Sequence, residues 1–135
     1  MTTVTPLLSF SRGAYDSVLA HARAGAPEEV CGVLGGEGET VTSADPVPNV
    51  ADCPTRRYEI DPEEQLRAIE AVESDGELLG FYHSHPEGPS EPSATDRAQA
   101  TWADTYYVIV SLPEESVTAW YWTGEEFLER AVEID

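Results

Sequence analysis

The sequence predicts a single α/β (α+β) domain over residues 1–135, with a central mixed β-sheet flanked by helices. Short apolar runs bounded by Gly and Pro alternate with segments whose apolar residues recur at helical spacing. A chain of 135 residues is long enough for one compact domain and too short for two. No internal repeat or long linker divides the sequence.

The first half of the chain is expected to place one helix among several strands. Ala14 and Val18 lie on one face of that helix, and Gly25 follows as its terminator. Gly35 and Gly36 are expected to close the strand that precedes them. The helix is expected at residues 11–24, and the strands at residues 5–10, 29–34, 40–50 and 56–60.

The second half is expected to begin with a helix. Pro62 fits its first turn, so Asp61, the residue before it, is the expected N-cap. Leu66, Ile69 and Val72 are expected to form the buried stripe of this helix. A proline-rich loop and a further helix follow the next strand. The remaining strands are expected at residues 77–84, 105–112, 116–122 and 126–134, the helix at 93–103, and a hairpin turn at 123–124.

The charge balance restricts the setting and the partners. The chain has 26 acidic and 7 basic residues, a net charge of -19, and no Lys. The acids are spread along the whole chain, so self-repulsion destabilises the fold unless salt screens it, and a halophilic cytoplasm is the expected setting. A phosphate backbone would be repelled, which argues against nucleic-acid binding. The sequence has no apolar run of membrane-spanning length and no secretory signal at its N-terminus, so a cytoplasmic protein without membrane partners is expected.

A candidate metal site lies in the segment from Gly80 to Asp96. On a strand, His83 and His85 point to the same face, about 6 to 7 Å apart along the chain. Tyr82 and Ser84 then point into packing on the other face. Asp96 can supply a third ligand, and two nitrogens, a carboxylate oxygen and a water make the open tetrahedral set of a catalytic zinc.

Ser93 has two compatible interpretations. It fits the N-cap of the helix expected at this point, with an acidic residue in the first turn. It can equally belong to the site, because a helix N-terminus can hold both a cap and a catalytic group. The two cysteines, Cys31 and Cys53, form no C-x-x-C pair and are expected to be reduced.

These residues resemble the JAMM (MPN-plus) zinc metalloprotease family. Its H-x-H-x7-S-x2-D motif matches at His83, His85, Ser93 and Asp96, and its upstream glutamate matches at Glu29. Glu29 lies in the stretch Pro-Glu-Glu-Val-Cys-Gly, residues 27–32. The resemblance covers the order of elements along the whole chain. It implies one MPN/JAMM domain with a cytidine-deaminase-like fold.

The resemblance also implies a role for each matching residue. One Zn²⁺ per chain is held by His83, His85 and Asp96, and lowers the pKa of its bound water. Glu29 takes the proton of that water and delivers it to the leaving amine. Ser93 donates a hydrogen bond to the oxyanion. Cys31 is expected to be a packing neighbour of Glu29, with a minor role in the site left open.

Within the family, the chain is most similar to the desampylases of halophilic archaea. That resemblance implies removal of ubiquitin-like modifier proteins from lysine side chains, after a C-terminal Gly-Gly, by a protein active as a monomer. Strand addition along residues 53–58 is one way to hold the tail, and Arg56 and Arg57 are the candidate contacts. A solvated surface pair is the alternative for the two arginines.

Two other functions stay open. One is processing of the C-terminus of a ubiquitin-like sulfur-carrier protein by the same chemistry. The other is a noncatalytic MPN scaffold, which is disfavoured because such scaffolds usually lack some ligands, and here the full set is present. A deaminase is disfavoured too, because the P-C-x-x-C element is missing.

The charge distribution makes a prediction about salt. Screening weakens the repulsion among 26 carboxylates, so both folding and activity should increase as NaCl rises into the molar range. Circular dichroism and activity across a salt series measure the two effects. Greatest stability in dilute buffer would contradict the halophilic interpretation.

Overall fold

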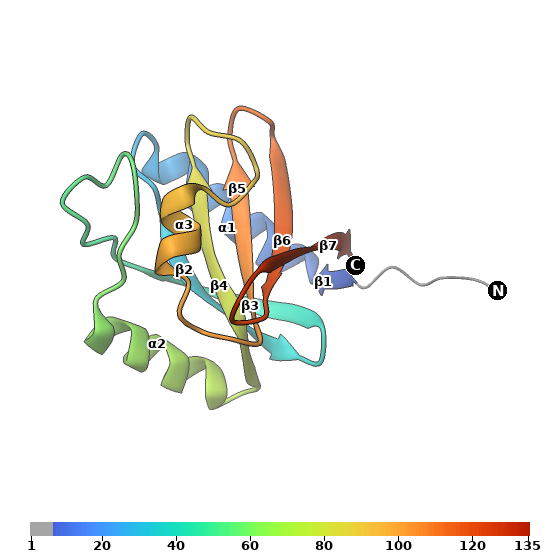
Figure 1. Ribbon diagram of the computed structural model, residues 1–135. Coiled ribbons are helices and arrows are strands. Elements are labelled where there is room, and N and C mark those ends of the chain that lie inside the picture. The colour runs from blue at the N-terminus through green and yellow to red at the C-terminus, as the bar shows by residue number, and fades with distance from the viewer. Residues whose placement is uncertain (1–6) are drawn as a thin grey trace.

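The computed structural model describes residues 7–135, and over that range seven strands close into a barrel in the order β1-β3-β2-β4-β5-β6-β7 (Figure 1). Three helices accompany them. The elements are β1 (Leu7–Phe10), α1 (Arg12–Gly25), β2 (Cys31–Glu37), β3 (Thr40–Val47), α2 (Pro62–Glu73), β4 (Glu77–His85), α3 (Ala94–Gln99), β5 (Thr105–Ser111), β6 (Ser116–Trp122) and β7 (Phe127–Ile134). The first two residues of the strand expected at 5–10 lie outside the described residues.

The sheet is mixed, as the sequence predicts. β1 pairs in parallel with β3 and β7, β4 pairs in parallel with β5, and the other pairs are antiparallel. The sheet closes into a barrel because β1 pairs with both of its ends, β3 and β7. Its pairing with β7 runs from Leu7 opposite Ala131 to Phe10 opposite Ile134.

Both faces of the central strands are covered by apolar side chains. One cluster contains Leu34 of β2, Tyr82 of β4 and the buried residues of α1. The other contains Val33, Phe81 and the buried residues of α2. Neighbouring residues of one strand thus belong to opposite clusters, as the two-residue period of a strand requires. Figure 1 shows α1 behind the strands and α3 in front of them.

The helices predicted at the start of each half are confirmed, and one buried residue was assigned wrongly. Ser11 caps α1 by accepting a hydrogen bond from the backbone N–H of Ala14, and Asp61 caps α2. Leu66 is 58% exposed. The buried face of α2 contains residues 65, 68, 69 and 72, the i, i+3, i+4, i+7 set, so Leu66 lies beside it.

Two strand boundaries also differ from expectation. β2 does not close at Gly35 and Gly36 but continues through a bulge to Glu37. A Cβ atom on Gly36 would lie 1.9 Å from the Thr40 carbonyl oxygen, so the glycine permits this close pairing rather than ending the strand. β3 stops at Val47, before Pro48, which lacks a backbone donor.

The strand expected at residues 56–60 is absent, and only an isolated bridge joins Asn49 to Ile60. The Asn49 side chain organises this segment instead. Its amide donates to the carbonyl oxygens of Glu29 (2.9 Å) and Arg57 (3.0 Å) and accepts from the N–H of Ala51 (3.0 Å). Several backbone hydrogen bonds to one side chain leave no repeating pattern in the sequence from which they could be predicted.

The helix expected at residues 93–103 is shorter, because α3 ends at Gln99. Beyond it, the Tyr107 hydroxyl accepts a hydrogen bond from the backbone N–H of Trp102 at 3.2 Å, which takes that donor away from any helix. In the described residues, 7–135, no helix has the length and apolarity needed to cross a membrane.

Candidate metal centre

The last residues of β4 carry the two histidines at the middle of the sheet. His83 lies opposite Cys31 of β2 on one side and Ile109 of β5 on the other. His83 and His85 are 2% and 7% exposed, and their rings are on the same face, as the sequence predicts. Ser84 points the other way and accepts a hydrogen bond from the backbone N–H of Val30. Hydrogen bonding on both sides of β4 thus fixes the backbone beneath both rings.

Asp96 enters from α3 and meets both histidines. Its Oδ2 atom lies 3.1 Å from His83 Nε2 and 3.0 Å from His85 Nε2, and the two Nε2 atoms are 3.1 Å apart. A tetrahedral zinc with bonds of about 2.0 to 2.1 Å needs ligand atoms about 3.3 Å apart. These three residues therefore fit a metal of that size after a small outward movement.

The N-terminus of α3 holds Asp96 in place through a capping box. The Ser93 hydroxyl accepts a hydrogen bond from the Asp96 N–H (3.0 Å), and the Ser93 N–H donates to Asp96 Oδ2 (2.9 Å). Both interpretations of Ser93 from the sequence are thus compatible with its position. The hydroxyl oxygen is used as an acceptor, so its proton stays free to be donated.

The two imidazoles are oriented by different neighbours. His85 Nδ1 donates to the Pro89 carbonyl oxygen at 2.6 Å, which leaves Nε2 to face Asp96. The His83 ring stacks on the Tyr58 ring, with centroids 4.4 Å apart and planes at 24°. Sequence reasoning missed Tyr58; the only available signal was an aromatic residue directly after two arginines.

Glu29 lies beside the donor set as a buried carboxylate. It is 7% exposed, and its Oε1 atom has no hydrogen-bond partner. A carboxylate oxygen lies within 4.8 Å of donor atoms of both His83 and His85. Its backbone is fixed, because the Glu29 N–H donates to the Pro54 carbonyl oxygen at 2.7 Å. An unpartnered buried carboxylate costs stability, which indicates a role other than packing.

Burial and hydrogen bonding favour the metal-binding forms of His83 and Asp96, but not that of His85. Burial raises the pKa of Glu29 to about 7, with Asp96 adding to the effect and His85 opposing it. Burial alone would raise the pKa of Asp96, but hydrogen bonds from His83 and His85 outweigh it and hold that pKa well below its ordinary value. Burial lowers the pKa of His83, which favours the neutral ring that binds metals. For His85, burial lowers the pKa, but the bonds to Asp96 and to the Pro89 carbonyl outweigh it and raise the pKa overall.

A cavity of about 310 Å³ opens onto the donor set. Glu29, His85 and Ser93 line it, together with most of the proline-rich loop of residues 86–92. Arg56 lines the same cavity. The Arg57 side chain instead lies 3.8 Å from the Asp52 carboxylate. Residues 53–58 have bend, turn and irregular backbone, so the edge strand expected there is absent.

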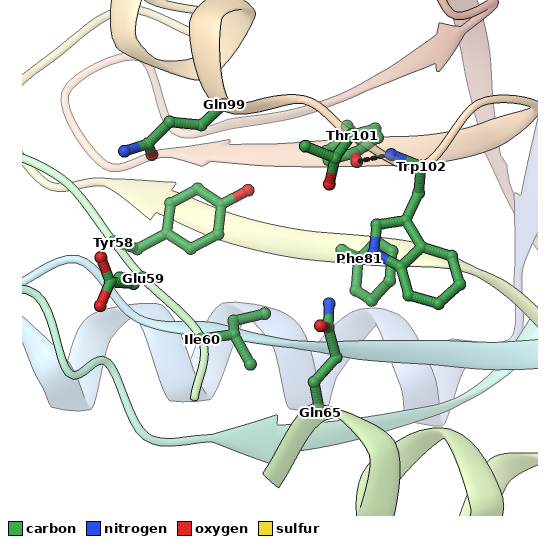
Figure 2. A pocket seen from close by; sticks show the side chains of 9 residues that line it. Tyr58, Glu59, Ile60, Gln65, Phe81, Gln99, Thr101 and Trp102 are labelled. Atoms are coloured by element: carbon green, nitrogen blue, oxygen red, sulfur yellow. Dashed lines mark hydrogen bonds between the residues drawn. The ribbon is translucent and has the colours of Figure 1, made fainter. Parts of the chain in front are cut away.

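A second cavity, of about 170 Å³, lies beyond Tyr58 (Figure 2). Its walls include Phe81 and Trp102, and Trp102 is 39% exposed. Figure 2 shows the Tyr58 hydroxyl and the Gln65 amide pointing into this space. Tyr58 therefore separates an aromatic cavity from the ring of His83.

Cys31 is a packing residue next to the centre. It is fully buried opposite His83, and its Sγ donates weakly to the Val47 carbonyl oxygen at 3.6 Å. Burial, together with the Glu29 charge, raises the pKa of its thiol to about 12, so the thiol stays protonated at neutral pH. Cys31 and the exposed Cys53 are both free thiols.

The raised pKa of Glu29 predicts a pH-dependent stability for the metal-free protein. The folded-state pKa of about 7 lies above the ordinary value of 4.5. The contribution of protonated Glu29 to the free energy of unfolding is therefore fully present below pH 4.5 and is lost as pH rises through 7. Glu29→Gln cannot ionise. The free energy of unfolding of this variant should be similar to that of the wild type at pH 5 and larger by about 2 kcal/mol at pH 8. Urea unfolding in chelator and molar salt measures this difference, and a difference independent of pH would contradict the assignment.

Comparisons with known proteins agree with the geometry. The family model for prokaryotic homologs of the JAB domain matches residues 11–123. The desampylase of Haloferax volcanii is 51% identical, covering 95% of this chain and 96% of that protein. The CysO-cysteine peptidase of Mycobacterium tuberculosis is 40% identical, covering 71% and 67% of the two chains. A solution structure from Desulfitobacterium hafniense has a TM-score of 0.84 and 29% identity, covering 96% of this chain and 93% of that one.

The matched range includes Glu29, both histidines, Ser93 and Asp96. It spans more than four fifths of the chain, and the Haloferax relative extends the match over nearly all of it. The fold and the relatives thus confirm the JAMM/MPN resemblance seen in the sequence. The chain belongs to the family of prokaryotic JAB-domain proteins.

Proposed function

We propose that this protein is a zinc-dependent isopeptidase that removes ubiquitin-like modifier proteins from lysine side chains after a C-terminal Gly-Gly. The observation that carries the proposal is the unpartnered, buried carboxylate of Glu29 beside three converging donor atoms. The similarity to the Haloferax desampylase over nearly the whole chain supports the choice of substrate. We further propose that residues 1–135 form one domain, active as a monomer in the cytoplasm.

One zinc ion per chain would be held by His83, His85 and Asp96. Two imidazole nitrogens and one carboxylate oxygen are a catalytic zinc set, because the fourth position stays open. When bound there, zinc would lower the pKa of a bound water and would polarise the scissile carbonyl. His83 and Asp96 already favour the neutral and ionised forms that binding requires.

Glu29 is the proposed general base and acid. Its carboxylate lies within 4.8 Å of the histidine donor atoms, so a water between them is within reach. A pKa of about 7 lets it accept a proton and return it to the leaving amine at neutral pH. The Pro54 carbonyl and the Asn49 amide fix its backbone on both sides.

Ser93 is the proposed oxyanion donor. Its hydroxyl accepts from the Asp96 N–H, and this fixes the oxygen while the proton remains available. Ser93 lines the same cavity as Glu29 and His85. A donor held in place before reaction stabilises the developing charge without reorganisation.

The cavity beside Arg56 is the proposed path of the modifier tail. A Gly-Gly segment has no side chains, so recognition must come from its main-chain carbonyls. Arg56 is the cation that lines this cavity, and its guanidinium can donate to those carbonyls. Arg57 is proposed to contribute less, because its side chain lies beside Asp52.

A second candidate is processing of the C-terminus of a ubiquitin-like sulfur-carrier protein. The similarity to the CysO-cysteine peptidase favours it, and the same residues would perform the chemistry. The two candidates differ in the leaving group: a lysine side chain in a conjugate, or a residue added to the carrier's terminus.

One prediction of the proposed function concerns Glu29 and the metal. Glu29→Gln should retain zinc and lose at least about a hundredfold in turnover, because general-base catalysis contributes that much. His83→Ala should lose zinc and activity together. Chelator should inactivate the wild type, and zinc should restore it. Product masses from lysine conjugates and from C-terminally extended carriers distinguish the two candidates. Normal turnover by Glu29→Gln would remove Glu29 from the mechanism.

Another prediction of the proposed function separates the two arginines. Arg56→Gln should raise KM for a modifier conjugate by about tenfold, equivalent to the loss of one charge-assisted hydrogen bond of about 1.4 kcal/mol. Arg57→Gln should have a smaller effect. Steady-state kinetics on one conjugate compare them, and equal changes in KM would contradict the assignment of Arg56 to the tail.

A further inference from the structure

The loop of residues 86–92 contacts His85, one of the proposed metal ligands. It lies between His85 and Ser93, and its Pro89 carbonyl accepts the His85 Nδ1 proton at 2.6 Å. The loop has no helical or strand backbone pairing of its own. The orientation of His85 therefore depends on what keeps the Pro89 carbonyl in place.

Side chains from the barrel clamp the loop on both sides of Pro89. Before it, the Ser111 hydroxyl donates to the Gly88 carbonyl oxygen at 2.8 Å. After it, the Thr118 hydroxyl donates to the Ser90 carbonyl oxygen at 2.6 Å. Ser111 is fully buried at the end of β5, and Thr118 lies on β6. Two rigid strands thus fix the residues on either side of the one that contacts His85.

Trp120 completes the clamp. Its indole Nε1 donates to the Thr118 hydroxyl oxygen at 2.9 Å and lies 3.3 Å from the Ser90 carbonyl oxygen. The Thr118 hydroxyl therefore accepts from Trp120 and donates to Ser90, and a chain of this kind strengthens each bond. On the other side of Ser90, its own hydroxyl donates to the Glu114 carboxylate at 2.7 Å.

We propose that Ser111, Thr118 and Trp120 are positioning residues that fix the His85 ring by clamping the loop against its Nδ1. With the proton held on Nδ1, Nε2 is the nitrogen presented to a metal. The inference rests on the zinc-holding part of the proposed function. None of the three residues reaches the donor atoms, so they act only through Gly88, Ser90 and the Pro89 carbonyl.

The test variant is Thr118→Val, which keeps the shape and removes the hydroxyl. The matched control is Ser116→Ala, because Ser116 lies on the same face of β6 and its hydroxyl has no partner. Thr118→Ser restores the hydroxyl and should restore wild-type behaviour. Ser111→Ala tests the other side of the clamp and serves as the second variant should Thr118→Val not fold.

Zinc affinity of each full-length variant is measured by competition with a chromophoric chelator. Loss of a group that orients a ligand costs 10- to 100-fold in metal affinity, so Thr118→Val and Ser111→Ala should each bind zinc about tenfold more weakly. NMR of the zinc-loaded proteins should show the His85 Nδ1 proton exchanging faster with solvent in both variants than in the wild type and in Ser116→Ala.

The outcomes separate this inference from the function on which it rests. A wild type that binds no zinc would overturn both. A wild type that binds zinc, with unchanged affinity and unchanged Nδ1 proton exchange in Thr118→Val and Ser111→Ala, would overturn the clamp alone. Weaker binding without faster Nδ1 exchange would also overturn it, because a general loss of stability does not act through His85.

Discussion

The whole site depends on the fixed position of β4 between β2 and β5. Backbone pairing on both sides holds the residues around His83 and His85, so the two rings have little freedom beyond their own side-chain torsions. Two nitrogens can then be kept 3.1 Å apart in a buried setting, where they would otherwise be unfavourable neighbours. Only Asp96 has to be brought in from elsewhere. The barrel holds the two histidines rigidly, and the short helix α3 supplies Asp96.

Much of the site was predictable because its spacing follows from local geometry. Residues two apart on a strand point to one face, so the shared face of His83 and His85 could be inferred from the chain alone. Ser93 lies three residues before Asp96, the spacing of a capping box, so that contact could be inferred too. The glutamate came from the family resemblance, and the structure places it beside the histidines. The clamp on the loop was not predictable, because Ser111 and Thr118 are ordinary polar residues until the fold brings β5 and β6 beside it.

The differences between the predicted and the observed fold also come from features that short sequence patterns do not encode. Closure of the barrel depends on β1 meeting β7, a pairing between the two ends of the chain that no local pattern encodes. The segment before α2 carries strand-like residues, but the Asn49 side chain hydrogen-bonds to its backbone and the segment forms no strand. Leu66 is apolar yet exposed, because the buried face of α2 runs through residues 65, 68, 69 and 72 and leaves position 66 beside it. In the first two cases contacts between distant segments decided the structure, and local preference alone does not encode them.

The capping box at α3 ties local folding to the site. A helix of six residues is too short to be stable in water by itself, and its first turn is held by the same Ser93 and Asp96 bonds that aim the carboxylate at the histidines. The helix and the ligand set therefore form together, as one cooperative unit. If Asp96 and the histidines bind zinc as proposed, the cation would also nucleate the helix, and the free energy of metal binding would become local folding energy for this part of the chain.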